Sequence, residues 1–299
     1  MIPAPRRAPH LRRSWLFLPG ADRSALLDAA RSGADVLIQE LEDFTPAERR
    51  GEARGLAAEV YAAWRAAGVL AAVRVNPLET VGGDDLRAAM AGRPDIVMMS
   101  KVARPEQVVA LEAAVSALEA EFGIAAGSTE LVPNVESAAG LVRTAAIAGA
   151  SARVTGALVA SEDMVADLGA ERTREGLELS YVRSRFLVEC VAAGVLAIDC
   201  PYIFGDEAGA EAEARTARRL GYKAKSLVSP GHAPSINRVL TPSAEEVVRA
   251  RRIVAAFEAA RAAGRDRAEV DGLLAEVPTY AAALRLLARA AELDQASRS

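Results

Sequence analysis

Histidine, cysteine and aromatic residues are scarce in this chain of 299 residues, and each scarcity argues against a class of protein. Only His10 and His232 are present, which disfavours a histidine-ligated zinc site or a Ser-His-Asp triad. We expect His232 to be a loop residue rather than a catalytic base. Cys190 and Cys200 lack CxxC spacing, so we expect two buried, reduced thiols rather than a redox pair.

Long apolar runs and a strong net charge are also missing. No segment approaches the roughly 18 uninterrupted apolar residues of a membrane-spanning helix, and the basic arm at residues 1–13, which we expect to be loose, lacks the apolar stretch of a signal peptide. We therefore predict a cytoplasmic protein without a membrane partner. A formal net charge of −4 gives no general reason to expect nucleic-acid binding. The phosphate-binding motifs GxGxxG and GxxxxGKS/T do not occur.

What the chain does contain is an alternation of short apolar segments and helical segments, with an irregular period and no visible sequence repeat. The apolar segments are typical of buried parallel strands and fall at residues 14–18, 35–41, 70–75, 95–100, 130–135, 154–161, 196–199 and 224–228. Helices are expected between them, at about residues 23–32, 46–67, 84–90, 104–121, 137–148, 173–193 and 208–220. Eight strand–helix units in about 240 residues indicate an α/β fold, a TIM (β/α)8 barrel rather than an open doubly wound sheet.

A C-terminal helical extension follows the predicted barrel domain of residues 1–240. Residues 241–299 contain one helix that ends near residue 263, with a capping-box spacing from Ser243 to Glu246, and a last helix at about residues 280–293. A polar connector, residues 265–278, separates them. The last helix could pack under its own barrel, but we favour docking on a neighbouring subunit, and hence a homo-oligomer such as a trimer or hexamer.

Charged residues follow six of the eight predicted strands. They are Glu40, Glu42 and Asp43, then Arg74, Lys101, Glu136, Glu162 with Asp163, and Asp199. In a barrel the carboxyl ends of the strands share one face, so these side chains should converge there. Each could instead be a helix cap or a salt-bridge partner. Their number favours a catalytic site, and with histidine scarce, the general base would be a carboxylate or metal-bound water.

The chemistry of this set suits a small anionic oxo acid that chelates a metal. Two carboxylates, Glu136 and Asp163, with room for substrate and water, are ligands that suit Mg²⁺. The planar guanidinium of Arg74 suits a carboxylate.

Seven short motifs spread over nearly the whole chain carry a resemblance to a known family. They are Arg13-Ser-Trp-Leu-Phe-Leu-Pro-Gly, Glu40-Leu-Glu-Asp43, Arg74-Val-Asn, Ser100-Lys-Val, Val135-Glu-Ser, Ser161-Glu-Asp163 and Val270-Asp-Gly. Together they resemble the citrate lyase β-subunit-like family, within the HpcH/HpaI superfamily of Mg²⁺-dependent aldolases with a phosphoenolpyruvate-binding TIM barrel. The resemblance implies a Mg²⁺-dependent carbon–carbon lyase that joins or cleaves a 2-oxo acid or glyoxylate and an acyl-CoA, as in citryl-, malyl- and citramalyl-CoA lyases.

The resemblance also implies a role for each matching residue. Glu136 and Asp163 match the metal ligands, and Arg74 matches the residue that binds the substrate carboxylate. The remaining assignments are Glu42 and Asp43 for ordering metal-bound water, Lys101, Glu136 and Glu162 for substrate binding, and Glu276 as a catalytic acid presented to a neighbour's site.

Three positions depart from the family pattern. Glu40 and Glu276 stand where the family has aspartate, and Ser229 stands where it has histidine. These changes fall where the acyl partner would lie, so the sequence leaves open whether CoA is used and which acids react. The other hypotheses are a 2-oxo-acid aldolase, an acyl-CoA thioesterase on the same barrel, and a non-catalytic subunit of a larger lyase complex.

Overall fold

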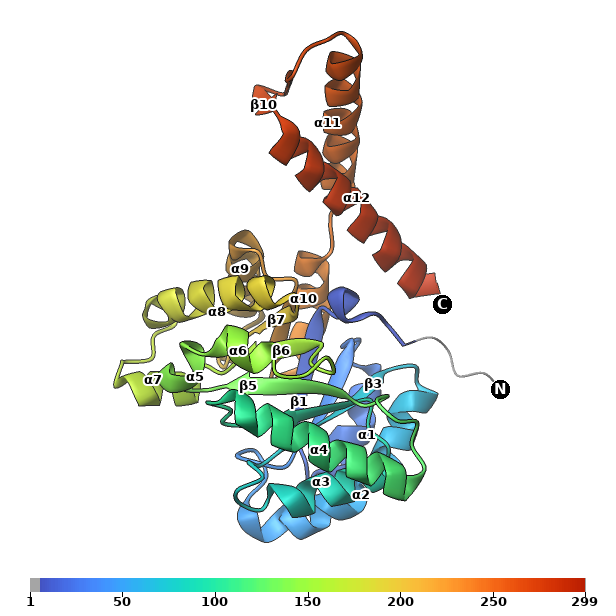
Figure 1. Ribbon diagram of the computed structural model, residues 1–299, viewed down its shortest axis with the longest axis vertical. Coiled ribbons are helices and arrows are strands. Elements are labelled where there is room, and N and C mark those ends of the chain that lie inside the picture. Colours follow the sequence, from blue (N-terminus) through green and yellow to red (C-terminus); the bar gives the residue numbers. More distant parts are fainter. Residues whose placement is uncertain (1–5, 299) are drawn as a thin grey trace. The chain divides into compact units, whose positions relative to one another are not determined.

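The computed structural model describes residues 6–298, and its main feature is a closed barrel of eight parallel strands (Figure 1). Each strand pairs with the next along the chain, and β1 pairs with β8. The predicted TIM barrel is therefore confirmed. The strands are β1 Ser14–Pro19, β2 Val36–Glu40, β3 Leu70–Val75, β4 Ile96–Met99, β5 Glu130–Val135, β6 Gly156–Val159, β7 Leu196–Asp199 and β8 Ala224–Leu227.

The interior of the barrel changes from apolar to charged along the strand direction. Side chains of alternate residues point inward, and the inner core contains Val36 and Ile38 of β2. The next residue in that inward series is Glu40, which is fully buried. In β3 the same step leads from the buried Ala72 to Arg74. The apolar layers thus support a charged layer at the carboxyl ends of the strands.

Helices follow the strands, as the βα pattern predicts. Their bounds are α1 Arg23–Asp28, α2 Arg50–Ala66, α3 Gly82–Ala91, α4 Pro105–Phe122, α5 Ala138–Leu141, α6 Thr144–Ala148, α7 Glu162–Leu168, α8 Ser180–Ala193, α9 Glu207–Leu220 and α10 Ala233–Leu240. The short helices α7 and α10 were not predicted from the sequence.

Two predicted helices are interrupted because side chains bond to the backbone. The helix expected at residues 137–148 is split into α5 and α6, and the Thr144 hydroxyl donates to the carbonyl oxygens of Gly140, at 3.3 Å, and Leu141, at 3.0 Å. The helix expected from residue 173 begins only at Ser180. Before it, the Glu178 carboxylate accepts hydrogen bonds from the backbone and the hydroxyl of Thr173, which holds that segment in a turn.

The prediction of a loose arm up to residue 13 is wrong for its last part. Residues 1–5 lie outside the described part of the chain, but Pro9–Leu11 forms a 3-10 helix. Arg12 is buried and makes two hydrogen bonds, of 2.5 and 2.7 Å, to the carboxylate of Glu130 at the start of β5. Arg13 pairs with Asp35, which precedes β2. Both ion pairs attach the arm to the amino ends of the strands.

The chain divides into two compact units, Ala8–Arg238 and a second that contains residues 239–298. The second has α11 Ala244–Ala262 with the predicted capping box, the antiparallel strands β9 Ala268–Val270 and β10 Leu273–Ala275, and α12 Val277–Arg298. The predicted polar connector is thus largely a hairpin. Its turn is Asp271-Gly272, with φ of 53° and 74°, the left-handed pair that tight hairpins require.

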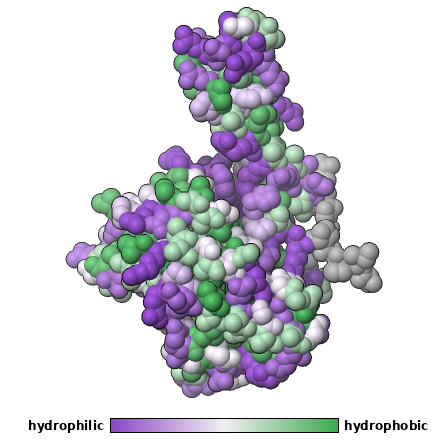
Figure 2. Space-filling model, in the orientation of Figure 1, coloured by the Kyte–Doolittle hydropathy of each residue, from purple (hydrophilic) through white to green (hydrophobic). Residues whose placement is uncertain are grey.

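Apolar side chains also appear on the surface of the barrel unit (Figure 2). Leu177 before α8, and Tyr181, Val188 and Val191 on α8, are between 67% and 79% exposed. Among residues 6–298, no helix combines the length and apolar character needed to cross a bilayer.

Candidate active site

Arg74, at the carboxyl end of β3, is the centre of the charged layer. Its Nε donates to Glu40 Oε1 at 2.9 Å, its Nη2 lies 3.2 Å from Glu42 Oε2, and its Nη1 lies 3.7 Å from Glu136 Oε1. The guanidinium carbon is 4.9 Å from the centre of the Phe17 ring. Burial by itself would lower the pKa of Arg74, but the three carboxylates raise it. Three of the predicted acids therefore surround one permanent cation.

Glu40 fixes both this arginine and the loop that follows β2. Its carboxylate accepts hydrogen bonds from the backbone amides of Glu42, at 2.7 Å, and Phe44, at 2.6 Å, while it also accepts one from Arg74. Burial raises its pKa, and the Arg74 charge opposes that effect. Because one carboxylate holds two amides and a guanidinium, the position of Glu42 depends on Glu40.

Gly20 allows the β1–α1 turn to pack against the same loop. A Cβ at residue 20 would lie 2.1 Å from the carbonyl oxygen of Glu40. The Thr45 hydroxyl donates to that carbonyl, at 2.5 Å, and accepts from the amide of Gly20, at 2.9 Å. Gly20, which directly follows β1, is therefore required by close packing.

Lys101, just after β4, adds a second cation beside Glu42. Its ammonium group forms an ion pair with Glu42 and lies 3.7 Å from Asp43 Oδ2. The hydrogen bond to Glu42 is the main cause that raises the pKa of Lys101. The residue has a φ of 55°, an uncommon conformation for a residue with a side chain, and it is about half exposed. Two cations thus flank Glu42, one buried and one reachable from solvent.

A cavity of about 170 Å³ lies over the charged layer. Its wall combines aromatic and aliphatic side chains with one cation and three acids, of which Glu162 is drawn toward Arg172, at 3.0 Å. The lining residues are Phe17, Asp43, Phe44, Arg74, Leu158, Ala160, Ser161, Glu162, Asp163, Pro201, Ile203 and Val228. The cavity is large enough for a small organic acid.

Glu136 is the acid with the most unusual environment. It is buried, and within the described residues 6–298 neither carboxylate oxygen accepts a hydrogen bond of ordinary geometry. Burial raises its pKa to about 8; Arg74 opposes this change, and the charges of Glu42 and Asp163 add to it. Arg74, the cation beside Glu136 in the charged layer, is shared with Glu40 and Glu42, so a hard cation would fit beside this carboxylate.

Glu136 and Asp163 are the residues that could share such a cation. In the described part of the chain, no group of three or more His, Cys, Asp or Glu side chains has the arrangement of a metal site. A cation held here would therefore take most of its ligands from water or substrate. Magnesium commonly binds in this way, through one or two carboxylates.

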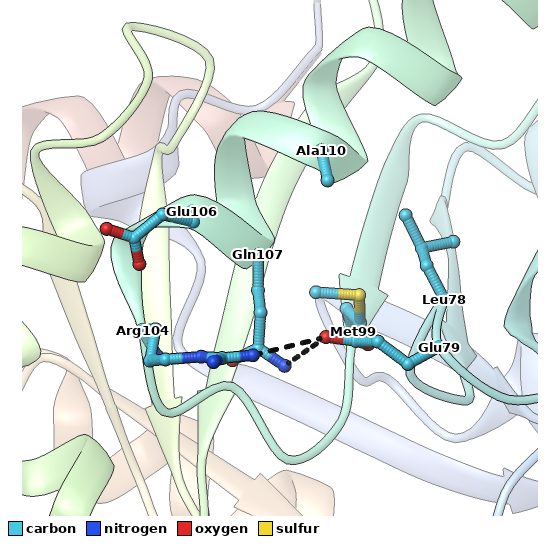
Figure 3. A pocket seen from close by; sticks show the side chains of 7 residues that line it. All are labelled: Leu78, Glu79, Met99, Arg104, Glu106, Gln107 and Ala110. Atoms are coloured by element: carbon cyan, nitrogen blue, oxygen red, sulfur yellow. Dashed lines mark hydrogen bonds and ion pairs between the residues drawn. The ribbon is translucent and has the colours of Figure 1, made fainter.

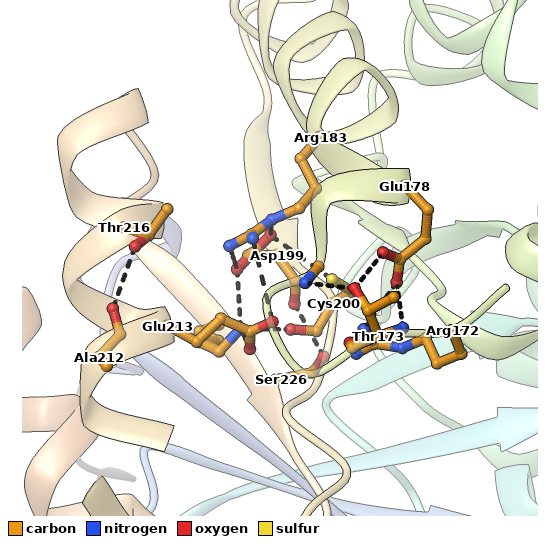
Figure 4. A network of polar contacts seen from close by, with 12 residues as sticks. Arg172, Thr173, Glu178, Arg183, Asp199, Cys200, Ala212, Glu213, Thr216 and Ser226 are labelled. Carbon is orange, nitrogen blue, oxygen red and sulfur yellow. Dashed lines mark hydrogen bonds and ion pairs between the residues drawn. The ribbon is translucent and has the colours of Figure 1, made fainter. Parts of the chain in front are cut away.

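Asp199, predicted to join the site, is instead used in a buried ion network (Figure 4). Its oxygens accept from Arg183, at 2.8 and 2.7 Å, and from Lys225, at 2.8 Å. Lys225 also pairs with Glu213 at 2.7 Å. Burial would raise the pKa of Asp199, but the two cations lower it. Lys225 was not expected in the site from the sequence, although a single lysine inside a strand segment is a visible signal.

The remaining sequence predictions fall outside this cavity. Both thiols are free and buried, as predicted, and burial raises the pKa of Cys200 to about 12. His232, predicted to be a loop residue rather than a base, is buried in the one-turn 3-10 helix Pro230–His232, in the connection between β8 and α10. Glu276 is exposed and directly precedes α12 in the second unit.

A second cavity, of about 250 Å³, was not expected from the sequence (Figure 3). In it, Gln107 donates to Glu79 at 3.1 Å, and Arg104 lies 3.8 Å from the same carboxylate. The other lining residues are Leu78, Met99, Glu106 and Ala110. Arg104 follows Lys101 by one short loop, so this cavity and the charged layer share the segment after β4.

A parallel barrel with a buried arginine and several acids at the carboxyl ends of its strands defines a TIM-barrel enzyme. The chain belongs to the HpcH/HpaI aldolase/citrate lyase family, whose model matches residues 13–230. The predicted family resemblance is therefore confirmed.

Individual relatives are similar over nearly the full chain. The citrate lyase subunit beta of Escherichia coli is 33% identical over 287 residues, which cover 95% of both chains. A (3S)-malyl-CoA thioesterase of Cereibacter sphaeroides is 31% identical over 289 residues, 94% of this chain and 95% of the relative. The crystal structure of the protein CitE from Mycobacterium tuberculosis, in complex with magnesium, acetoacetate and coenzyme A, is 29% identical with a TM-score of 0.74, covering 93% of this chain and 98% of the other.

Proposed function

We propose that the chain is a Mg²⁺-dependent carbon–carbon lyase that cleaves or forms a 3-hydroxyacyl-CoA from a 2-oxo acid and an acyl-CoA. The observation that carries this proposal is the pairing of Arg74, which lines the small cavity together with Asp163, with the carboxylate of Glu136, whose oxygens make no hydrogen bond within the described residues. The magnesium, oxo-acid and coenzyme A complex of the CitE neighbour supports the choice of ligands.

In this mechanism Arg74 binds the carboxylate of the 2-oxo acid, since its guanidinium reaches the cavity wall. Glu136 and Asp163 would hold Mg²⁺, which when bound supplies a Lewis acid for developing oxyanion charge. Glu42, held by Arg74 and Lys101, accepts hydrogen bonds from water in the site, as does Asp43.

In the cleavage direction, a base removes the 3-hydroxyl proton, the bond between carbons 2 and 3 of the 3-hydroxyacyl-CoA breaks, and the 2-oxo acid leaves with its new carbonyl group. The electron pair remains on carbon 2 of the acyl-CoA, which then takes up a proton. We assign that proton to a carboxyl group, Glu276 of a neighbouring chain, because a group in the second unit can act on a neighbour's barrel.

The metal assignment is tested with Glu136→Gln and Asp163→Asn. Both variants should lose at least ten-fold in affinity for Mg²⁺ and for an oxo acid in its presence, measured by isothermal titration calorimetry. Glu207→Gln, an exposed acid at the start of α9, serves as the control and should bind as the parent does. Folded variants that bind both ligands like the parent would show that the metal lies elsewhere.

The assignment of Glu276 is tested by truncation after Gly264 and by Glu276→Gln. Either change should abolish turnover while oxo-acid binding to the barrel stays measurable. Sedimentation of the full chain should show a homo-oligomer, to which the exposed apolar residues of α8 would contribute. Full activity of the truncated protein would rule out a catalytic role for the extension.

A second candidate, supported by the malyl-CoA thioesterase relative, is hydrolysis of the acyl-CoA thioester. The cavity beside Arg104 could receive part of a CoA molecule in either case. Incubation of the enzyme with acyl-CoAs, with and without oxaloacetate, pyruvate or glyoxylate, separates the two reactions. A lyase joins the acyl-CoA and the oxo acid into a 3-hydroxyacyl-CoA and keeps the thioester, whereas a thioesterase hydrolyses the thioester and releases free CoA.

A third arrangement follows from the E. coli relative, which is a subunit of citrate lyase. Purification with partner chains, and activity only in their presence, would favour a role as a subunit. An oligomer of this chain that is active by itself would contradict it. The cytoplasmic location stays a prediction.

A further inference from the structure

Asn134 in β5 is a fully buried amide whose hydrogen bonds are missing. Neither its side-chain nitrogen nor its side-chain oxygen has a partner within the described residues 6–298. A buried amide normally has at least one partner, and one without any destabilises the fold. This side chain therefore needs an explanation outside the stability of the barrel.

Other buried amides of this chain show what a structural role looks like. Gln39 is equally buried, but its Nε2 donates to the carbonyl oxygens of Gly20, at 3.0 Å, and Ala53, at 2.7 Å, and its Oε1 accepts from the Tyr61 hydroxyl at 2.6 Å. Asn76 likewise donates to a carbonyl oxygen and to a carboxylate. The side-chain amides of Gln39 and Asn76 thus make hydrogen bonds within the fold, whereas that of Asn134 makes none within the described residues.

The position of Asn134 relates it to the candidate active site. It lies two residues before Glu136, so the two side chains point to the same side of the strand, toward the barrel interior. Val132, two residues earlier, belongs to the inner apolar core. Across the sheet, Asn134 is paired with Leu158, which lines the 170 Å³ cavity. The amide thus stands between the apolar core and the charged layer, next in the sheet to a residue that lines the cavity.

A polar group that lines this cavity is also without a partner. Ser161 lines the cavity, is buried, and its hydroxyl makes no hydrogen bond within the described residues. An unpartnered hydroxyl in the cavity wall, and an unpartnered amide in the strand next to that wall, favour a ligand with its own polar atoms over an apolar one.

We propose that Asn134 is a specificity-determining residue that hydrogen-bonds an oxygen atom of the substituent on carbon 3 of the 2-oxo acid. This inference rests on the proposed function. Arg74 and the metal would hold the carboxylate and the 2-oxo group, which leaves the substituent on carbon 3 to meet the rest of the cavity. A neutral amide can donate to a hydroxyl or carboxylate oxygen without adding charge to a layer that already holds three acids around Arg74. The site therefore selects 2-oxo acids with an oxygen-bearing substituent over those with an alkyl group.

The test compares hydroxypyruvate with 2-oxobutyrate, which have nearly the same shape and differ by a hydroxyl in place of a methyl group. Binding to the full chain is measured by calorimetry in the presence of Mg²⁺. The parent should bind hydroxypyruvate at least ten-fold more tightly, and Asn134→Leu should reduce that preference to less than two-fold. Thr129→Val, which removes a buried hydroxyl just before β5, is the control and should keep the parent's preference.

The other possible results of this binding experiment each decide between the inference and the proposed function. Equal binding of the two acids by the parent, or an unchanged preference in Asn134→Leu, would overturn the inference and leave the lyase proposal standing. Binding of neither acid by the parent would refute the proposed function and the inference with it. If Asn134→Leu does not fold, as judged by circular dichroism, the smaller Asn134→Ala takes its place with the same expected loss of preference.

Discussion

Replacement of Glu136 by glutamine should raise the unfolding free energy of the metal-free protein above that of the parent. This difference should increase with pH. Burial raises the pKa of this carboxyl from its ordinary value of 4.5 to about 8. The folded protein therefore binds the proton more tightly than the unfolded chain does. The stability that this group contributes is fully present below about pH 4.5 and is lost as the pH rises through about 8. Glutamine has nearly the same shape and carries no charge at either pH.

The size of the effect follows from the shift in pKa. Each pKa unit corresponds to roughly 1.4 kcal/mol, so ionisation of Glu136 should cost the parent on the order of 3–4 kcal/mol between pH 5 and pH 8. Arg74, at 3.7 Å, opposes this cost and is already included in the shift. Other titrating groups are common to the parent and the variant. The difference in unfolding free energy between the parent and Glu136→Gln should therefore change by about 3–4 kcal/mol from pH 5 to pH 8.

The assay is urea denaturation of the parent, Glu136→Gln and the control Glu207→Gln, in EDTA, at several pH values from 5 to 8. The control should differ from the parent by a constant amount. Added Mg²⁺ at pH 8 should stabilise the parent and leave Glu136→Gln unchanged, because a ligand stabilises only the state that binds it. A pH-independent difference would mean that Glu136 is not desolvated. A variant that becomes less stable than the parent as the pH rises would show that Arg74 outweighs burial, and the reasoning would fail.

Three further predictions concern packing and buried charge. Gly20→Ala should cost at least about 2 kcal/mol in urea denaturation, because the new Cβ would lie 2.1 Å from the Glu40 carbonyl oxygen. Glu40→Gln should weaken oxo-acid binding in calorimetry about ten-fold, since one charge-assisted bond to Arg74 and one to an amide are lost, and Glu40→Asp should recover part of it. Lys225→Met should cost about 3–5 kcal/mol, because Asp199 stays buried with one cation fewer, and a double variant that also carries Asp199→Leu should be more stable than the single one.

The barrel was predictable because its determinants are local and repeated. Each strand is a short apolar run, and each run is followed by a helical segment, so the number of strand–helix units indicated eight parallel strands although their spacing is irregular. Closure of the barrel then brings the strand ends together. That geometry explains why Glu40, Glu42 and Glu136 could be expected near Arg74 before any contact was known.

Failures in the prediction of secondary structure had two different causes. The hairpin at Asp271-Gly272 had a readable signal, the Asp-Gly pair, which the polar composition of the connector obscured. The break after α5 depends on a threonine hydroxyl that bonds to backbone carbonyls, and a helical composition gives no warning of it. The ion pair of Arg12 with Glu130 joins residues 118 positions apart, so no local pattern could show that the arm is attached.

By itself the sequence determined the fold, the family and the set of charged residues at the strand ends, because these depend on the order of residue types along the chain. Only the tertiary structure decided which of these charged side chains are held in structural ion pairs and which can bind a ligand. Asp199 is neutralised by Arg183 and Lys225, which lie 16 and 26 residues away along the chain, whereas Glu136 keeps two oxygens without hydrogen bonds. The same holds for Asn134, since whether a buried amide is satisfied depends on neighbours from other strands, and the sequence does not specify their positions.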